Sequence, residues 1–157
     1  MYDQRASQLV RAPRSAVYAV LLDPQAVESW RVPDDMTARI HEWEPHEGGR
    51  FRVSLSYRAP DRTGKTDGAT DTYAGTFTRL VPGELVVEEL AFETADPALQ
   101  GTMTMTWTLR ETSVDGTDGT EVDLFHEGLP DVVPPEDNQV GTRMSLTKLA
   151  AYVEAAG

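Results

Sequence analysis

The 157-residue chain contains no cysteine and few basic residues, and both absences exclude classes of function. Without cysteine, the chain can form no disulfide framework, no thiolate nucleophile and no cysteine-based zinc site. Lysine and arginine number 14 against 26 acidic residues, which gives a formal net charge of -12. Because basic side chains bind nucleic-acid phosphates and anionic membrane surfaces, this balance argues against both partners. Solubility is the ordinary reason for such an acidic composition.

Long apolar runs are missing as well. The longest covers residues 16–22, which is far short of the roughly 20 residues that cross a bilayer. Residues 1–5 lack the basic and then apolar pattern of a secretory signal. We therefore expect a cytoplasmic protein, and the length predicts a single domain over residues 1–157.

Most of the sequence shows the alternation of apolar and polar residues that is typical of strands, and helical patterns occur near its two ends. Apolar and polar residues alternate most clearly at residues 103–109, where methionine, tryptophan and leucine alternate with threonine. Two short helices, at residues 13–22 and 24–30, follow the first strand, and Pro24 suits the first position of the second helix. The chain pattern predicts strands at residues 4–11, 36–43, 51–57, 73–77, 85–93, 103–109 and 121–127, turns at 48–49 and 115–119, and a loop at 59–70.

One long helix is predicted over residues 136–155. Its apolar residues Leu146, Leu149, Ala150 and Val153 recur at the spacing of one helix face. Prolines precede it and acidic residues fill its first turn, and both features favour a helix start. A single apolar stripe of this kind must pack on the sheet.

The sheet and this helix together predict a cavity. Antiparallel strands with this alternation have one apolar face and one wet face, and the apolar residues here are unusually bulky. A helix is about 10 Å wide and cannot cover six strands spaced about 4.8 Å apart. We therefore expect an α+β fold with a curved antiparallel sheet of about six to seven strands wrapped around the C-terminal helix, and a gap between them.

A series of short motifs occurs in a fixed order through nearly the whole chain. They are Ala12-Pro13, Val17, Leu22-Asp23-Pro24, Trp30, Pro33, Met36, Gly48-Gly49-Arg50-Phe51, Gly75-Thr76-Phe77, residues 80–86, residues 126–130, Asn138, Gly141, Leu146 and Leu149. Together they resemble the SRPBCC or START-like superfamily, which has the helix-grip fold, and within it the branch of activator of Hsp90 ATPase homologues. The resemblance is more specific for fold than for function.

Thr142 departs from the family pattern, in which tryptophan usually follows the helix glycine. One interpretation is that a bulkier sheet residue compensates for the lost ring. The other is a roomier and more polar mouth of the cavity. Both stay open at the level of the sequence.

The candidate ligand-binding residues are those expected on the apolar face and on the helix surface that meets it. Aromatic and thioether side chains suit flat hydrophobic ligands, although many of these residues could equally fill the core. The predicted set is Trp43, Phe51, Val53, Leu55, Tyr57, Tyr73, Phe77, Glu88, Met105, Trp107, His126, Thr142, Ser145, Leu146 and Leu149, and Phe125 is also expected in the wall.

His126 and Glu88 need a separate interpretation. His126 shares a strand face with Val122 and Leu124, so it could hydrogen-bond a ligand or act as a general base, or it could be a core histidine bonded to backbone. Glu88 lies on the more apolar face of its strand, where an inward carboxylate needs a partner, or else it sits on a wet rim.

Three functions remain compatible with the sequence. The first is non-catalytic binding of a small hydrophobic or aromatic molecule, lipid- or polyketide-like, by a monomer or homodimer. The resemblance also implies two alternatives, an enzyme of the polyketide cyclase, dehydratase or hydrolase kind using His126 and Glu88, or an Hsp90-type co-chaperone module. No pattern indicates a metal site or a cofactor, because His41 and His46 would point to opposite faces of a strand.

Overall fold

The computed structural model describes residues 1–58 and 70–156, and in that part of the chain it contains seven strands and three helices. The strands are β1 Tyr2–Val10, β2 Met36–Trp43, β3 Arg50–Tyr57, β4 Thr70–Val81, β5 Leu85–Phe92, β6 Met103–Val114 and β7 Thr117–Leu129, and the helices are α1 Arg14–Leu22, α2 Pro24–Trp30 and α3 Pro135–Ala156. All neighbouring strands are antiparallel, and the sheet order is β1-β7-β6-β5-β4-β3-β2.

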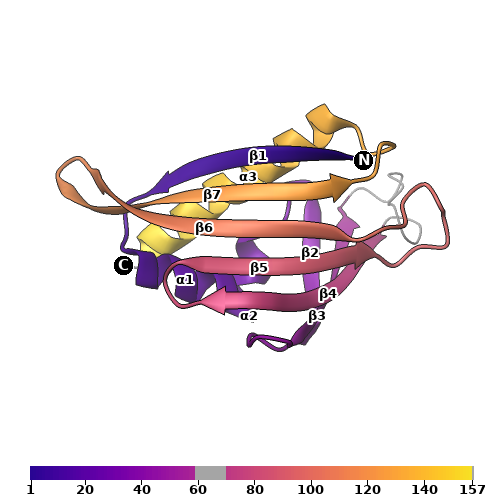
Figure 1. The fold of residues 1–157 in the computed structure, drawn as a ribbon. Helices are drawn as coiled ribbons and strands as arrows, with labels where there is room; N and C mark the ends of the chain where they lie inside the picture. The colour runs from indigo at the N-terminus through magenta and orange to yellow at the C-terminus, as the bar shows by residue number, and fades with distance from the viewer. Residues whose placement is uncertain (59–69, 157) are drawn as a thin grey trace.

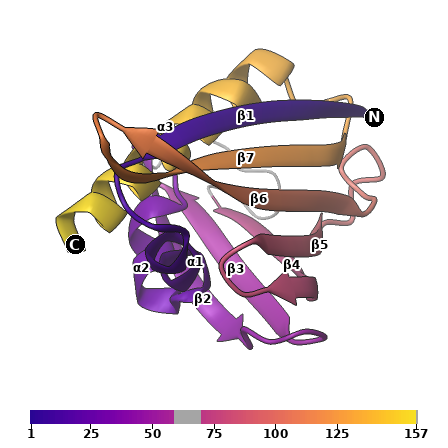
Figure 2. The same cartoon turned by 60° about the vertical axis from the view of Figure 1, so that its left-hand side comes forward.

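The sheet curls around α3, as Figures 1 and 2 show. The helix crosses the concave face diagonally, while β2 and β3 turn away from β6 and β7 to form the far wall. The stripe formed by Leu146, Leu149, Ala150 and Val153 is buried against the sheet. This arrangement confirms the predicted α+β helix-grip fold.

Local signals explain the two short helices. The Asp23 carboxylate accepts a hydrogen bond from the Gln25 amide at 3.0 Å, and Pro24 occupies the first helical position of α2. Pro13 precedes α1 in an extended conformation. The pair packs against one end of the concave face, where the Trp43 indole donates a hydrogen bond to the Leu22 carbonyl at 2.8 Å.

The strands extend beyond their predicted bounds at several points. Only Asp115 and Gly116 form the turn between β6 and β7, with φ of 52° and 77°, so the predicted turn at 115–119 is too long. These left-handed residues form the two-residue hairpin turn that matches strand twist. Thr70 begins β4 instead of ending the predicted loop, and residues 59–69 of that loop lie outside the described part.

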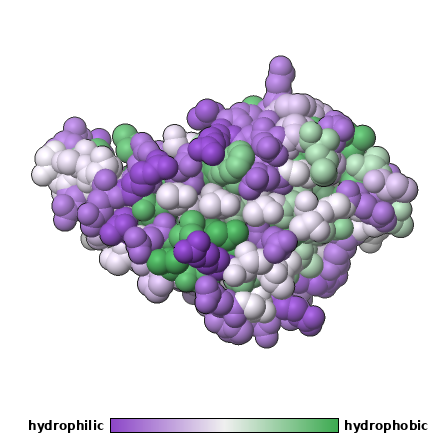
Figure 3. All heavy atoms as spheres, viewed as in Figure 1, coloured by the Kyte–Doolittle hydropathy of each residue, from purple (hydrophilic) through white to green (hydrophobic). Residues whose placement is uncertain are grey.

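The convex face is mostly polar. Figure 3 shows hydrophilic and intermediate residues over most of it. The threonines that alternate with the apolar residues of β6 belong to this face. Among the described helices, none combines the length and the apolar character that crossing a lipid bilayer requires.

Candidate functional site

A cavity of about 920 Å³ lies between the concave face of the sheet and the N-terminal half of α3. The segment after α2 closes one side of it. Its described lining includes Arg31, Pro33, Asp34, Asp35, Met36, Leu55, Tyr57, Asp71, Tyr73, Leu90, Phe92, Leu99, Met103, Met105, Trp107, Leu124, His126, residues 132–134, Asp137, Asn138, residues 140–142, Met144 and Ser145.

The lining contains eight of the fifteen predicted site residues. They come from four strands and from the first half of α3, so the expected meeting of sheet and helix does occur. These eight are Leu55, Tyr57, Tyr73, Met105, Trp107, His126, Thr142 and Ser145.

The other predicted wall residues need a correction, because they pack behind the cavity or beyond its end. Trp43, Phe51 and Phe77 form an aromatic cluster with ring centroids 5.0–5.9 Å apart. This cluster lies at the end of the concave face that α1 and α2 cover. The residues that lie outside the lining are Trp43, Phe51, Val53, Phe77, Glu88, Leu146 and Leu149. Five of them belong to the buried hydrophobic core, and Trp43 is partly buried and packs against it.

Phe125 also needs correction. It lies on the opposite face of β7 from His126, and the Arg5 guanidinium sits 4.3 Å from its ring centroid. Successive residues of a strand point to opposite faces, so Phe125 and His126 cannot both face the cavity.

Glu88 points inward but does not reach the cavity, because two donors hold it within the wall. Its side chain is 1% exposed, which contradicts the rim position. One carboxylate oxygen accepts a hydrogen bond from Arg31 Nη1 at 2.8 Å, and the other accepts from Trp107 Nε1 at 2.9 Å. The carboxylate therefore has the partners that burial requires.

Arg31 lies between Glu88 and the cavity. Its guanidinium carbon is 5.7 Å from the centroid of the Tyr73 ring and 5.5 Å from that of Trp107, and Nη2 contacts the Met105 sulfur at 3.3 Å. Burial lowers the pKa of Arg31, but the charge and hydrogen bond of Glu88 outweigh burial and raise the net pKa above its usual range. Arg31 is therefore a fixed cation whose charge is matched within the wall.

His126 is buried, at 9% exposed, and lines the cavity. Neither ring nitrogen has a hydrogen-bond partner among the described residues, so the interpretation of a backbone-bonded core histidine is wrong. Burial, and then the nearby charge of Arg31, lower the pKa of His126 to about 4. The ring is therefore neutral at neutral pH, and leaving its polar atoms unpaired costs about 1–3 kcal/mol.

The mouth of the cavity is partly apolar. Val132 and Val140 line it and are each 55% exposed. Thr142 and Ser145 are half-buried on the α3 surface beside them. Two contacts hold this end of the helix, since Asn138 Nδ2 donates to Gln4 Oε1 at 2.7 Å and the Tyr2 hydroxyl donates to the Val133 carbonyl at 2.6 Å.

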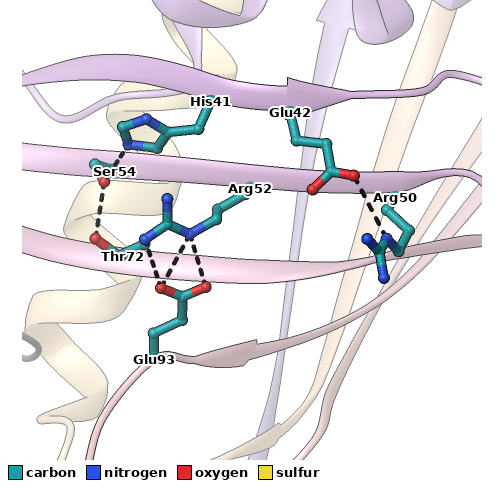
Figure 4. A network of polar contacts seen from close by, with 7 residues as sticks. All are labelled: His41, Glu42, Arg50, Arg52, Ser54, Thr72 and Glu93. Carbon is teal, nitrogen blue, oxygen red and sulfur yellow. Dashed lines mark hydrogen bonds and ion pairs between the residues drawn. The ribbon is translucent and has the colours of Figure 1, made fainter.

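A second group of polar side chains lies on the convex face, away from the cavity. Figure 4 shows His41, Ser54 and Thr72 in a chain of contacts, and a separate ion pair between Arg52 and Glu93. His41 Nε2 lies 2.8 Å from Ser54 Oγ, which lies 2.8 Å from Thr72 Oγ1. None of these lines the cavity. Within residues 1–58 and 70–156, no three histidine or acidic side chains lie close enough to hold a metal ion.

The chain matches a known protein family over most of its length. A family model described as Activator of Hsp90 ATPase homolog 1-like protein matches residues 11–154, which include most of the sheet and nearly all of α3. The chain belongs to this family. The resemblance drawn from the sequence motifs is thereby confirmed. The comparison with curated proteins gave no match.

Solved structures with the same fold include proteins from several bacteria. A protein from Chromobacterium violaceum is 30% identical, with a TM-score of 0.82 over 97% of this chain and 96% of that chain. A Silicibacter pomeroyi protein of the same family designation is 16% identical, with a TM-score of 0.74 over 99% of this chain and 100% of that chain. A Staphylococcus epidermidis protein is 14% identical, with a TM-score of 0.74 over 99% and 91%. The last two share the fold.

Arg31 is the residue of this Hsp90-ATPase-activator-like domain that sequence reasoning missed. A buried carboxylate at Glu88 signals that a cation must lie nearby, but it does not say which of the 14 basic residues supplies it. Arg31 follows the last residue of α2 and belongs to no periodic pattern. The sequence reasoning also missed the lining residues Leu90, Leu99 and Met144.

Proposed function

We propose that this family member binds a small hydrophobic or aromatic molecule between the sheet and α3, without catalysing a reaction on it. The observation that carries the proposal is the cavity, whose volume of about 920 Å³ falls within the range of small-molecule sites. Aromatic rings of Tyr57, Tyr73 and Trp107 line it together with the thioethers of Met103 and Met105. Such a wall suits a flat apolar ligand, because aromatic rings stack on it and flexible methionine side chains adjust to its shape.

The geometry supports binding more strongly than acid–base catalysis by Glu88 and His126. A cyclase, dehydratase or hydrolase would need at least two polar groups facing the ligand together. Glu88 has both oxygens engaged and does not line the cavity, so it cannot pair with His126 on a ligand. The co-chaperone role that the family name suggests stays a separate prediction, which a pull-down with purified Hsp90 would check.

Fluorescence titration with N-phenyl-1-naphthylamine, a neutral aromatic probe, tests the binding proposal. We expect saturable binding with one site per chain. Thr142→Trp restores the ring usual in the family and fills the mouth, so it should weaken binding at least about tenfold, because overpacking a site displaces its occupant.

The matched control places the same ring on the solvent side of α3. Ala151 is exposed, so Ala151→Trp should leave probe binding at the wild-type level. Equal weakening by the two tryptophan variants, or the absence of saturable binding by the wild type, would contradict the proposal.

A further inference from the structure

His126 is a buried polar group of the cavity wall, and a purely apolar ligand would leave its ring nitrogens without a hydrogen bond. It belongs to a row across the concave face that strand register sets, with Glu88 opposite Met105, Met105 opposite His126, and His126 opposite Gln4. Glu88 is held by two donors, and Gln4 accepts a hydrogen bond from Asn138. The imidazole therefore stands without a hydrogen bond among the described residues, in a row whose other polar members, Glu88 and Gln4, have theirs.

An apolar side chain would suit the position of His126 if packing were its only role. Val122 and Leu124 precede it on the same strand face and are almost fully buried. Both ring nitrogens are covered by neighbouring atoms, and Met105 lies directly opposite on β6. Methionine has a flexible side chain, so its rotation can bring an occupant of the cavity within reach of the imidazole.

The charged residues of the cavity lining restrict the charge that a ligand can carry. In the described part of the lining, Arg31 is the only lysine or arginine, and Glu88 already matches its charge. The lining also contains four aspartates, Asp34, Asp35, Asp71 and Asp137. A carboxylate or phosphate ligand would therefore meet no unmatched cation on these residues, which favours a neutral ligand over an anionic one.

We propose that the ligand is a neutral aromatic molecule bearing a hydroxyl group, and that His126 is the specificity-determining residue that hydrogen-bonds this hydroxyl. The inference rests on the proposed function and names the chemistry of the molecule bound. A neutral imidazole has one donor nitrogen and one acceptor nitrogen, and a hydroxyl group can pair with either. A hydrocarbon pairs with neither.

Nuclear magnetic resonance titrations with three probes of one ring system test the proposal: 2-naphthol, 2-methylnaphthalene, which replaces the hydroxyl with a methyl of similar size, and anionic 2-naphthoate. The measured quantity is the ratio of the Kd of 2-methylnaphthalene to that of 2-naphthol. We expect this ratio to fall at least about tenfold in His126→Leu, because the lost hydrogen bond affects only the hydroxylated probe.

Two further variants separate recognition from general damage. His126→Gln keeps a donor and an acceptor and should recover part of the wild-type ratio, whereas His41→Leu removes a histidine of the convex face and should leave the ratio unchanged. A ratio that is the same in the wild type and His126→Leu overturns the inference, and tightest binding of 2-naphthoate overturns its neutral-ligand part. Both results leave the proposed function standing, while failure of all three probes to bind overturns the proposed function and this inference with it.

Discussion

Replacing His126 with leucine should make the protein more stable, and increasingly so as the pH falls. In the folded protein the pKa of His126 is about 4, against an ordinary value of 6.5, because burial and then the charge of Arg31 disfavour the imidazolium, with Glu88 and Asp3 opposing them. Above pH 6.5 both the folded and unfolded chains hold the ring neutral. Between pH 6.5 and pH 4, His126 is protonated in the unfolded chain but stays neutral in the folded chain, so folding stability is lost as the pH falls.

The magnitude follows from the size of the pKa shift. One pKa unit corresponds to about 1.4 kcal/mol, so 1.5 units between pH 6.5 and pH 5 correspond to about 2 kcal/mol at the lower pH. At about pH 7.5, His126→Leu removes only the unpaired ring nitrogens, which should stabilise the fold by about 1–3 kcal/mol. At pH 5 the advantage of the variant should grow by a further ~2 kcal/mol.

Urea unfolding of the wild type and His126→Leu at about pH 7.5 and pH 5 measures both effects. The lower pH stays above the sequence pI of about 4.5, which keeps the protein charged. Carboxylates titrate in both proteins, so the difference between them isolates His126. A difference in unfolding free energy that stays constant between the two pH values, within about 0.5 kcal/mol, would refute the reasoning.

Two further predictions concern the wall and the sheet. Arg31→Met should destabilise the fold by about 3–5 kcal/mol, because Glu88 then stays buried without its cation. The double variant Arg31→Met with Glu88→Gln should recover most of that loss. Urea unfolding that shows no recovery in the double variant would contradict the ion-pair account. Gly75→Ala would place a Cβ 1.9 Å from a backbone oxygen of β5, so we expect a loss of about 3 kcal/mol or more. Gly83→Ala, in open space at φ of +74°, should cost only about 1 kcal/mol by thermal unfolding, and equal losses at both positions would contradict the steric explanation.

The fold could be predicted from the sequence because each element has its own local signal. The spacing of Leu146, Leu149 and Val153 predicts the buried face of α3, and the alternation in β6 predicts its inner and outer faces. The predicted hairpin turn includes Asp115 and Gly116 but is too long, because Gly119 also favours a turn although it lies within β7.

The cavity wall could be predicted only in part, because alternation tells which face a residue is on and not how far along the strand the cavity reaches. On β3, Phe51 and Leu55 share the inner face, yet only Leu55 lines the cavity. The other end of that face is covered by α1 and α2, a packing arrangement that no local pattern encodes. Arg31 could not be predicted for the same reason, because its ion pair with Glu88 joins residues 57 positions apart and no local pattern encodes it.

The sheet order delays the completion of the cavity until α3 has been made. β1 precedes the other elements in the sequence, yet its neighbour in the sheet is β7, and the hydrogen bond between Gln4 and Asn138 joins residues 134 positions apart. Contacts between such distant parts of a chain slow folding, because a long loop must close before they form. A nascent chain that has not yet released α3 would have an uncovered concave face, with methionines and aromatic rings open to water. Under the proposed function, a ligand can therefore be enclosed only after α3 has packed on the sheet and β1 has paired with β7.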